Sequence, residues 1–367
     1  MRRPAALLLL APALLAALLL AAPGAAAHAC YVVETGPEQC AGLHPDAGAL
    51  WRAAAHPVVA ALLLLTLAAP FLAYAAWRAD LRDRFGAPVG RLVETLRSYE
   101  DLLPWMLRLS LGIALAAAGS VGYLFSPLVP IPGGSLAQGA LFLLGFLFLL
   151  GLLVRPAALA TAALFGYALA TSHFVLGATE ILGASLVLLV LGGGRPSLDH
   201  LLQATLDPQR RFGWALAGRP GLLGATAPYT PLVLRLAFAA TLAYGALVEK
   251  LLNPEFALHV VETHGLASLA PWPASGWVVL VGAGELLLAL LFVAGFLTRA
   301  TSVATFLILT ATLFYFGESL ASHVTLFGVA SWLFTTGAGP WSVDRTLHAD
   351  ERPRRSRLRD VDTAIPE

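Results

Sequence analysis

The feature that most constrains this chain is an apolar run over residues 277–300, WVVLVGAGELLLALLFVAGFLTRA. It is long enough to cross a lipid bilayer as a helix, because a span needs about 20 apolar residues. It carries one acid, Glu285, inside the run and ends close to Arg299. A weaker copy without the acid lies near residues 133–156. Such runs recur along the chain, so we predict an all-α polytopic membrane protein.

Composition supports this class. The chain is 58% hydrophobic and only 12% charged, whereas roughly a quarter of the residues in soluble domains are charged. The formal net charge is +1, so nothing in the overall charge favours a nucleic-acid partner. The expected environment is the lipid bilayer, and the expected localisation is the plasma membrane.

The N-terminal residues 1–27 have the pattern of a signal peptide. Arg2 and Arg3 precede an apolar region that ends in small residues, and cleavage after Ala27 is expected. The alternative is an uncleaved anchor helix. In either case residues 28–56 form a segment outside the cytoplasm.

Cys30 and Cys40 are the only cysteines, and both lie in this outer segment. A disulfide between them is expected in an oxidising compartment. A metal or redox site that also uses His28 and His44 is the alternative, although the spacing matches no standard site. We therefore predict no metal site.

Arginine clusters give the topology, because cytoplasmic loops carry an excess of Lys and Arg. Clusters follow residue 77, residue 194 and residue 351. They are consistent with nine spans after the signal peptide, with the mature N-terminus outside and the C-terminus in the cytoplasm. The expected regions are a first span with an amphipathic cytoplasmic segment (57–103), a first four-helix repeat with its loop (104–230), a second four-helix repeat (231–348) and a cytoplasmic tail (349–367).

The two repeats share three landmarks in the same order. They are P-x-x-x-R-L, then G-x-x-x-R, then G-x-G-x-x-S-[LV]-D. Each repeat has an even number of spans, so both are predicted to insert in the same orientation, as parallel repeats. The charged landmark residues are expected to anchor the inner surface or, for the acids, to cap a short interfacial helix; they are Arg108, Arg155, Asp199, Arg235, Arg299 and Asp344.

Within the second repeat, Glu285 and Lys250 are expected to form an ion pair. Lys250 lies fifteen residues after Arg235, or ~22 Å higher at 1.5 Å per residue. Glu285 lies fourteen residues before Arg299, or ~21 Å higher. A lone charge at this depth costs about 2.5–3.5 kcal/mol on insertion scales, and pairing would reduce that cost. The first repeat has Tyr123 and Leu141 at the corresponding positions, so it lacks both charges.

Other polar groups are expected near the outer end of the bundle. Glu249, Glu318 and His323 are the candidates for binding there, together with Glu285 and Lys250 as candidate catalytic residues. Arg235 and Arg299 are candidates for contact with a quinone head group or an anion at the inner surface. Glu180 and His173 are interpreted as interfacial groups of the first repeat.

These residues resemble the DoxX/DoxD-like membrane proteins. The resemblance rests on the four-span unit, on Gly284-Glu285 followed by Gly295-Phe296-Leu297-Thr298-Arg299, on the position of Lys250 and on the terminal G-x-G-x-x-S-[LV]-D. It covers residues 231–344 and, more weakly, 104–199. It implies a tandem duplicated four-helix unit and a redox association, since DoxD-like members are linked to thiosulfate:quinone oxidoreduction and DoxX-like members to membrane oxidoreductase assemblies.

Three functions therefore remain open. The first is a subunit of a quinone-linked membrane oxidoreductase, with a quinone and a redox partner subunit. The second is a small-solute transporter or a receptor without redox chemistry. The third is a membrane scaffold in which the ion pair only fixes the register of the helices.

Overall fold

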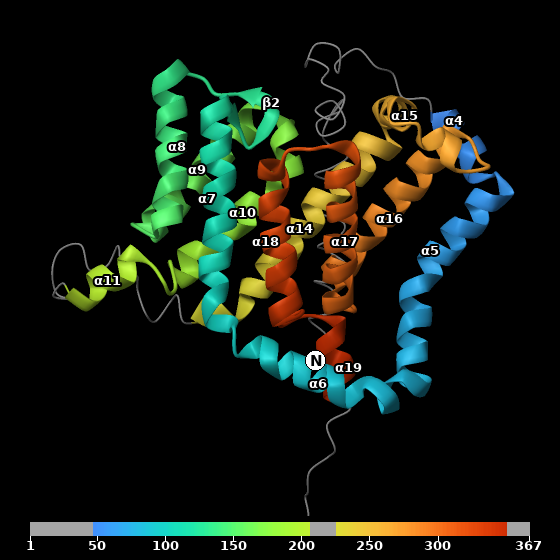
Figure 1. Ribbon diagram of the computed structural model, residues 1–367, viewed down its shortest axis with the longest axis horizontal. Helices are drawn as coiled ribbons and strands as arrows, with labels where there is room; N and C mark the ends of the chain where they lie inside the picture. Colours follow the sequence, from blue (N-terminus) through green and yellow to red (C-terminus); the bar gives the residue numbers. More distant parts are fainter. Residues whose placement is uncertain (1–46, 206–224, 351–367) are drawn as a thin grey trace, which may run out of the picture.

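The computed structural model describes residues 47–205 and 225–350. The predicted signal peptide, Cys30, Cys40 and most of the C-terminal tail lie outside these residues. Within them the protein is an all-α helical bundle with one two-stranded hairpin (Figure 1). The predicted fold class is thus confirmed.

Nine helices of the described residues fit the predicted spans. Seven are long and apolar enough to cross a membrane, and two shorter apolar helices, Gly134–Leu150 and Leu320–Thr336, complete the set. The additional first span is α5 (Pro57–Ala76). The first repeat consists of α7 (Leu103–Val121), α8 (Gly134–Leu150), α9 (Val154–Thr171) and α10 (Thr179–Leu191). The second consists of α14 (Thr230–Ala246), α16 (Ala274–Ala294), α17 (Thr298–Phe316) and α18 (Leu320–Thr336).

Shorter elements connect and flank these spans. On the side of the landmark arginines they are η1 (Trp77–Leu81), α6 (Arg82–Arg97), η2 (Glu100–Leu102), α11 (Leu198–Thr205), η4 (Ala227–Tyr229) and α19 (Val343–Asp350). On the opposite side they are α4 (Ala47–Ala54), β1 (Tyr123–Leu124), β2 (Ser126–Pro130), η3 (His173–Ala178), η5 (Leu247–Leu251), α15 (Pro254–Thr263) and η6 (Leu266–Leu269). Figure 1 shows α6 and α4 at these two opposite ends of the molecule.

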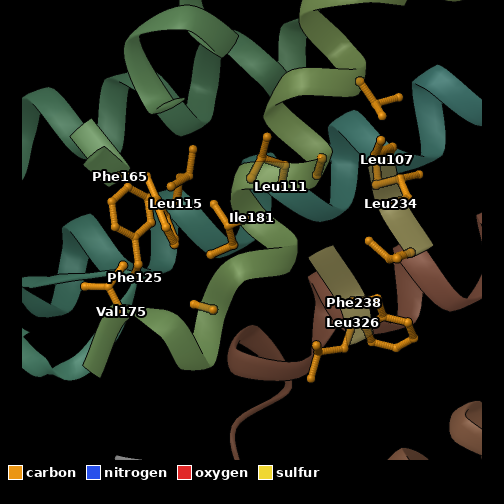
Figure 2. Close-up of a cluster of buried hydrophobic side chains, with 14 of the residues drawn as sticks. Leu107, Leu111, Leu115, Phe125, Phe165, Val175, Ile181, Leu234, Phe238 and Leu326 are labelled. Carbon is orange, nitrogen blue, oxygen red and sulfur yellow. The ribbon is translucent and has the colours of Figure 1, made fainter. Parts of the chain in front are cut away.

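The two repeats pack as a pseudo-symmetric pair. The first helix of each repeat lies against the last helix of the other, so that α7 contacts α18 and α14 contacts α10. Reciprocal packing of this kind is expected when two parallel repeats are related by a pseudo-twofold axis that runs along the bundle. The central core contains Leu107, Leu111 and Leu115 of α7. They lie beside Ile181 of α10, Phe238 of α14 and Leu326 of α18 (Figure 2).

The first span, α5, packs on the second repeat. Near its start, Val59 is buried in a separate cluster with Val278 and Val279 of α16. Near its end, Tyr74 makes an edge contact with Phe296, with ring centroids 5.5 Å apart. Its middle exposes large apolar side chains such as Leu64 and Leu65, which suits a helix that faces lipid.

The three landmarks contact one another at one end of each repeat, the end that the arginine clusters predict to be the inner one. In the second repeat Arg235 is fully buried and donates to the backbone oxygens of Ala338 (2.7 Å) and Trp341 (2.9 Å). Arg299 donates to the oxygens of Phe334 (3.0 Å) and Thr335 (3.0 Å) at the end of α18. These carbonyls belong to a helix end and its following loop, where intrahelical donors are missing.

The first repeat has the same contacts. Arg108, which is 2% exposed, donates to the oxygen of Pro196 at 2.7 Å. Arg155 donates to Leu189 and Val190, at 3.2 Å and 3.3 Å. The expectation that Arg108 and Arg235 anchor the inner surface is therefore wrong, because both are buried, whereas Arg155 and Arg299 are partly exposed. A helix end offers unpaired carbonyls, and the guanidinium groups satisfy them inside the protein.

The two landmark aspartates cap other helices than expected. Asp199 accepts from the backbone N–H groups of Leu153 (2.6 Å) and Val154 (2.8 Å), at the start of α9. Asp344 accepts from Leu297 (2.7 Å) and Thr298 (2.9 Å), at the start of α17. The short helices α11 and α19 are instead capped by the serine hydroxyls of the same landmark, Ser197 and Ser342.

Candidate functional site

The structure brings Lys250 and Glu285 into contact, as their matching depths predict. The ammonium nitrogen of Lys250 lies 2.7 Å from Oε2 of Glu285. Lys250 is in η5, directly after α14, and Glu285 is in α16, which packs along α14. Their side chains are 20% and 23% exposed, so the pair is reachable from outside the bundle.

Local backbone structure places this pair. Residues 247–251 form a π-helical turn, a distortion that is frequent at functional sites. Lys250 Nζ also donates to the oxygen of Gly245 at 3.3 Å, across this turn. A Cβ atom at Gly245 would lie 3.0 Å from Oε1 of Glu285, so the absence of a side chain there leaves room for the carboxylate.

The first repeat lacks the turn as well as the charges. After α7 the chain reaches Gly122, whose φ of 101° is in the left-handed region, and then forms the hairpin of β1 and β2. The position of Lys250 is thus occupied by Tyr123 at the start of β1. The sequence of residues 104–230 predicts only helical spans and so does not predict the hairpin.

A second titratable pair lies at the start of α18. Nε2 of His323 lies 3.1 Å from Oε2 of Glu318, and both side chains are buried, at 2% and 5% exposed. Nδ1 of His323 lies 3.2 Å from the oxygen of Ser319, and the Ser322 hydroxyl also donates to that oxygen. Nδ1 also lies 3.2 Å from the Ser322 hydroxyl oxygen, so the imidazole is held between the acid and two serines.

These groups form one polar cluster of the second repeat. Lys250 contacts Glu285 directly and also interacts electrostatically with Glu249 and Glu318. Glu249, the neighbour of Lys250 in η5, is 1% exposed. The predicted outer residues, Glu249, Lys250, Glu285, Glu318 and His323, are thus brought together, and we refer to them as the outer cluster.

Arg235 and Arg299 are not part of the outer cluster. Both lie at the inner end, where their guanidinium groups bind backbone oxygens of the loop after α18 and of its last turn. These contacts give them a structural role, and contact with a ligand stays a prediction.

The buried aspartate of the first repeat has a perturbed pKa. Burial raises the pKa of the Asp199 carboxyl group from its ordinary value, while the two backbone N–H donors and Arg155 oppose the shift. A carboxylate that is taken out of water in this way depends on its donors to stay ionised. Asp199 therefore belongs to the framework of the inner end.

Sequence reasoning missed the role of Glu180. It is 3% exposed and lies between the repeats, where the hydroxyls of Thr241 (2.7 Å) and Thr325 (3.0 Å) donate to its two oxygens. The interpretation as an interfacial acid used only its place at a helix start. A signal was present in the sequence, because Thr325 occupies the position in the second repeat that corresponds to Glu180 in the first.

Part of the second repeat is similar to a known family, since residues 230–318 match the DoxX family model. No curated protein and no solved structure matches the chain. The matched residues run from the start of α14 to Glu318, so they contain four of the five residues of the outer cluster. The protein is an all-α polytopic membrane protein in which residues 230–318 match the DoxX family model.

Proposed function

We propose that this protein is a subunit of a quinone-linked membrane oxidoreductase and that the outer cluster is its proton-exchanging site. The observation that carries the proposal is the partly exposed ion pair of Lys250 and Glu285 inside a membrane span. Ionisable residues within spans mark functional sites by default, since their desolvation is costly.

The chemistry follows from the charges. Oxidation of a quinol to a quinone releases two protons and two electrons. The Glu285 carboxylate accepts one proton as a general base, and the ammonium group of Lys250, 2.7 Å away, balances the charge of that carboxylate before the transfer. The second proton passes to the pair of His323 and Glu318, whose Nε2 and Oε2 atoms lie 3.1 Å apart. The two electrons pass to a redox partner protein.

Binding of a quinone can be measured without knowing that partner. The purified full-length protein in lipid nanodiscs is titrated with a short-chain benzoquinone, and the quenching of tryptophan fluorescence is recorded. Trp277 lies in the first turn of the helix that carries Glu285, and the ring of Trp272 packs 5.3 Å from it, so a quinone at the outer cluster is expected to quench both. Saturable quenching that weakens at least tenfold in Glu285→Gln, and not in the control Glu255→Gln, is expected. Equal affinity in all three proteins would contradict the proposal.

A proton-coupled carrier of a small solute is the second candidate. It is favoured by two cavities that lie at opposite ends of the contact between the repeats. One is lined by Pro104, Pro231 and Trp332 at the inner ends of the central helices, and the other by Glu180, Glu249 and Thr325. Parallel repeats around one axis are a common carrier design. Solute uptake by proteoliposomes that depends on a pH gradient, without quinone binding, would favour this function.

A further inference from the structure

A small polar cavity lies between the two repeats, on the side of the outer cluster. Its volume is about 80 Å³. Both repeats contribute to its wall: Ala118 from α7 and Glu180 from α10, and Glu249 from η5 and Thr325 from α18. The hairpin of the first repeat closes it with Ser126. The two charged lining residues are both carboxylic acids.

Glu180 is held in this wall by contacts that cross between the repeats. Its Oε2 accepts from the Thr241 hydroxyl at 2.7 Å and its Oε1 accepts from the Thr325 hydroxyl at 3.0 Å. Its backbone N–H donates to the same Thr241 oxygen at 3.1 Å. Both side-chain donors are neutral hydroxyls, which can bond to a carboxylate or to the carbonyl of a protonated acid. The geometry therefore accommodates either protonation state of Glu180.

A buried phenol lies behind the cavity wall, next to the lining residue Gly177. Tyr244 is fully buried, and its hydroxyl has no hydrogen-bond partner among the described residues. Its ring would lie 3.3 Å from a Cβ atom at Gly177, a residue that lines the cavity, and Oε1 of Glu249 would lie 3.8 Å from the same atom. A buried polar group without a partner commonly indicates a water molecule. The lining itself offers hydroxyl groups, from Ser126, Ser322 and Thr325, and the carboxyl groups of Glu180 and Glu249.

The size and the lining of the cavity fit water. One buried water molecule needs roughly 10–15 Å³ of such space and two to four polar partners. The volume of about 80 Å³ is therefore enough for several molecules. We propose that this cavity holds connected water molecules and that Glu180 binds and releases a proton through them, in exchange with Glu249. The first repeat, which lacks the ion pair, then contributes its own acid to proton transfer.

The charge environment of Glu180 is set by the elements packed against α10 and by the cavity lining. α10 has no other acid or base within its bounds, and α7 presents only Ala114, Leu115 and Ala118 to the cavity. On the elements packed against α10, the titratable groups toward the same end as Glu180 are His173 on η3, Tyr244 on α14 and His323 on α18. Tyr167 lies along α9, whereas Arg108, Arg155, Tyr229 and Arg235 lie at the opposite ends of these elements. Tyr123 on β1 and Glu249 on η5 face Glu180 across the cavity.

Infrared difference spectroscopy of the purified full-length protein tests the proposal without a quinone. Spectra are recorded as the pH is lowered, and the carbonyl band of protonated carboxylic acids is followed. We expect the wild type to gain a band that Glu180→Gln lacks and that Glu255→Gln retains. Identical spectra of the wild type and Glu180→Gln would overturn the assignment. Should Glu180→Gln fail to fold, Thr325→Val keeps the acid and removes one donor, so it is expected to shift the frequency of the same band, and an unshifted band would overturn the assignment.

Filling the cavity tests the role of water. Ala321 lines the cavity on α18, and Ala321→Leu displaces its contents while leaving both acids in place. We expect exchange of the Glu180 band in deuterium oxide to slow at least tenfold. Equal exchange in the variant and the wild type would show that the proton reaches Glu180 by another route. Neither result depends on whether the protein binds a quinone, so failure here is distinguishable from failure of the proposed function.

Discussion

At the scale of single residues, the Lys250–Glu285 pair illustrates how a membrane span keeps an acid. Each charge alone would be costly in the bundle, and a contact of 2.7 Å between them offsets part of that cost. The pair also shows what sequence alone can and cannot supply. Distances along two helices predicted the contact, because helix rise is constant. They did not predict Glu180, whose partners come from two other helices.

Replacing one member of the pair is expected to be worse than replacing both. Lys250→Tyr or Glu285→Leu alone leaves an unpaired charge, with a loss of about 3 kcal/mol or less because the pair is partly exposed. The double variant restores the residues of the first repeat and is expected to recover most of that loss. Unfolding of the purified proteins by heat or denaturant measures the difference. Additive losses would contradict a direct interaction.

A methyl group beside the pair is expected to disturb it. In Gly245→Ala the new Cβ atom would lie 3.0 Å from Oε1 of Glu285 and 3.6 Å from Nζ of Lys250. We expect at least a tenfold weaker quinone affinity, with a fold that stays intact. Gly284→Ala is the control, since nothing lies within 4 Å of its Cβ position. Equal affinity in both variants, measured by fluorescence quenching, would show that the pair is not part of the site.

At the scale of elements, the three landmarks form one joint at the inner end of each repeat. Their recurrence in the sequence predicted a duplication but not that they touch. The reason is that the contacts go to backbone groups, which leave no mark on residue identity. Leu153 and Leu297 are examples, because their backbone N–H groups donate to the two aspartates at the helix starts. Both residues have a φ of 52°, a left-handed conformation that a leucine in the sequence does not indicate.

Loss of either aspartate cap is expected to destabilise its repeat by a similar amount. Asp199→Ala and Asp344→Ala each remove an acceptor from two backbone N–H groups. Cap deletions cost about 0.5–2 kcal/mol. Thermal unfolding of the two variants measures both losses. If only one variant were less stable than the wild type, the two joints would not be equivalent.

At the scale of the whole molecule, the two repeats fit against each other through small residues. A Cβ atom at Gly328 of α18 would lie 2.3 Å from the hydroxyl oxygen of Ser110 on α7. At the equivalent contact between α10 and α14, a Cβ atom at Gly183 would lie 2.4 Å from the Cβ atom of Ala237. Composition and spacing predicted parallel repeats. They did not predict that the first helix of each repeat packs on the last helix of the other, since an apolar helix can be covered by any apolar neighbour.

Gly328→Ala is expected to destabilise the contact between the repeats. Overpacking of this kind costs about 1–3 kcal/mol. Adding Ser110→Gly removes the opposing side chain, so the double variant is expected to regain stability. Gly166→Ala on α9, where nothing lies within 4 Å, is the control. A double variant as unstable as Gly328→Ala, in the same unfolding experiment, would contradict the packing described here.

The most direct test of the proposed function is the rate of quinol-dependent electron transfer in native membranes, which supply the redox partner. Membranes that contain the wild type are compared with membranes that contain equal amounts of Glu285→Gln or of the control Glu255→Gln. A positioned acid or base contributes typically about 10²–10⁴-fold to a rate, so we expect at least a tenfold loss for Glu285→Gln alone. Equal rates in all three membranes would contradict a proton-exchanging role for Glu285.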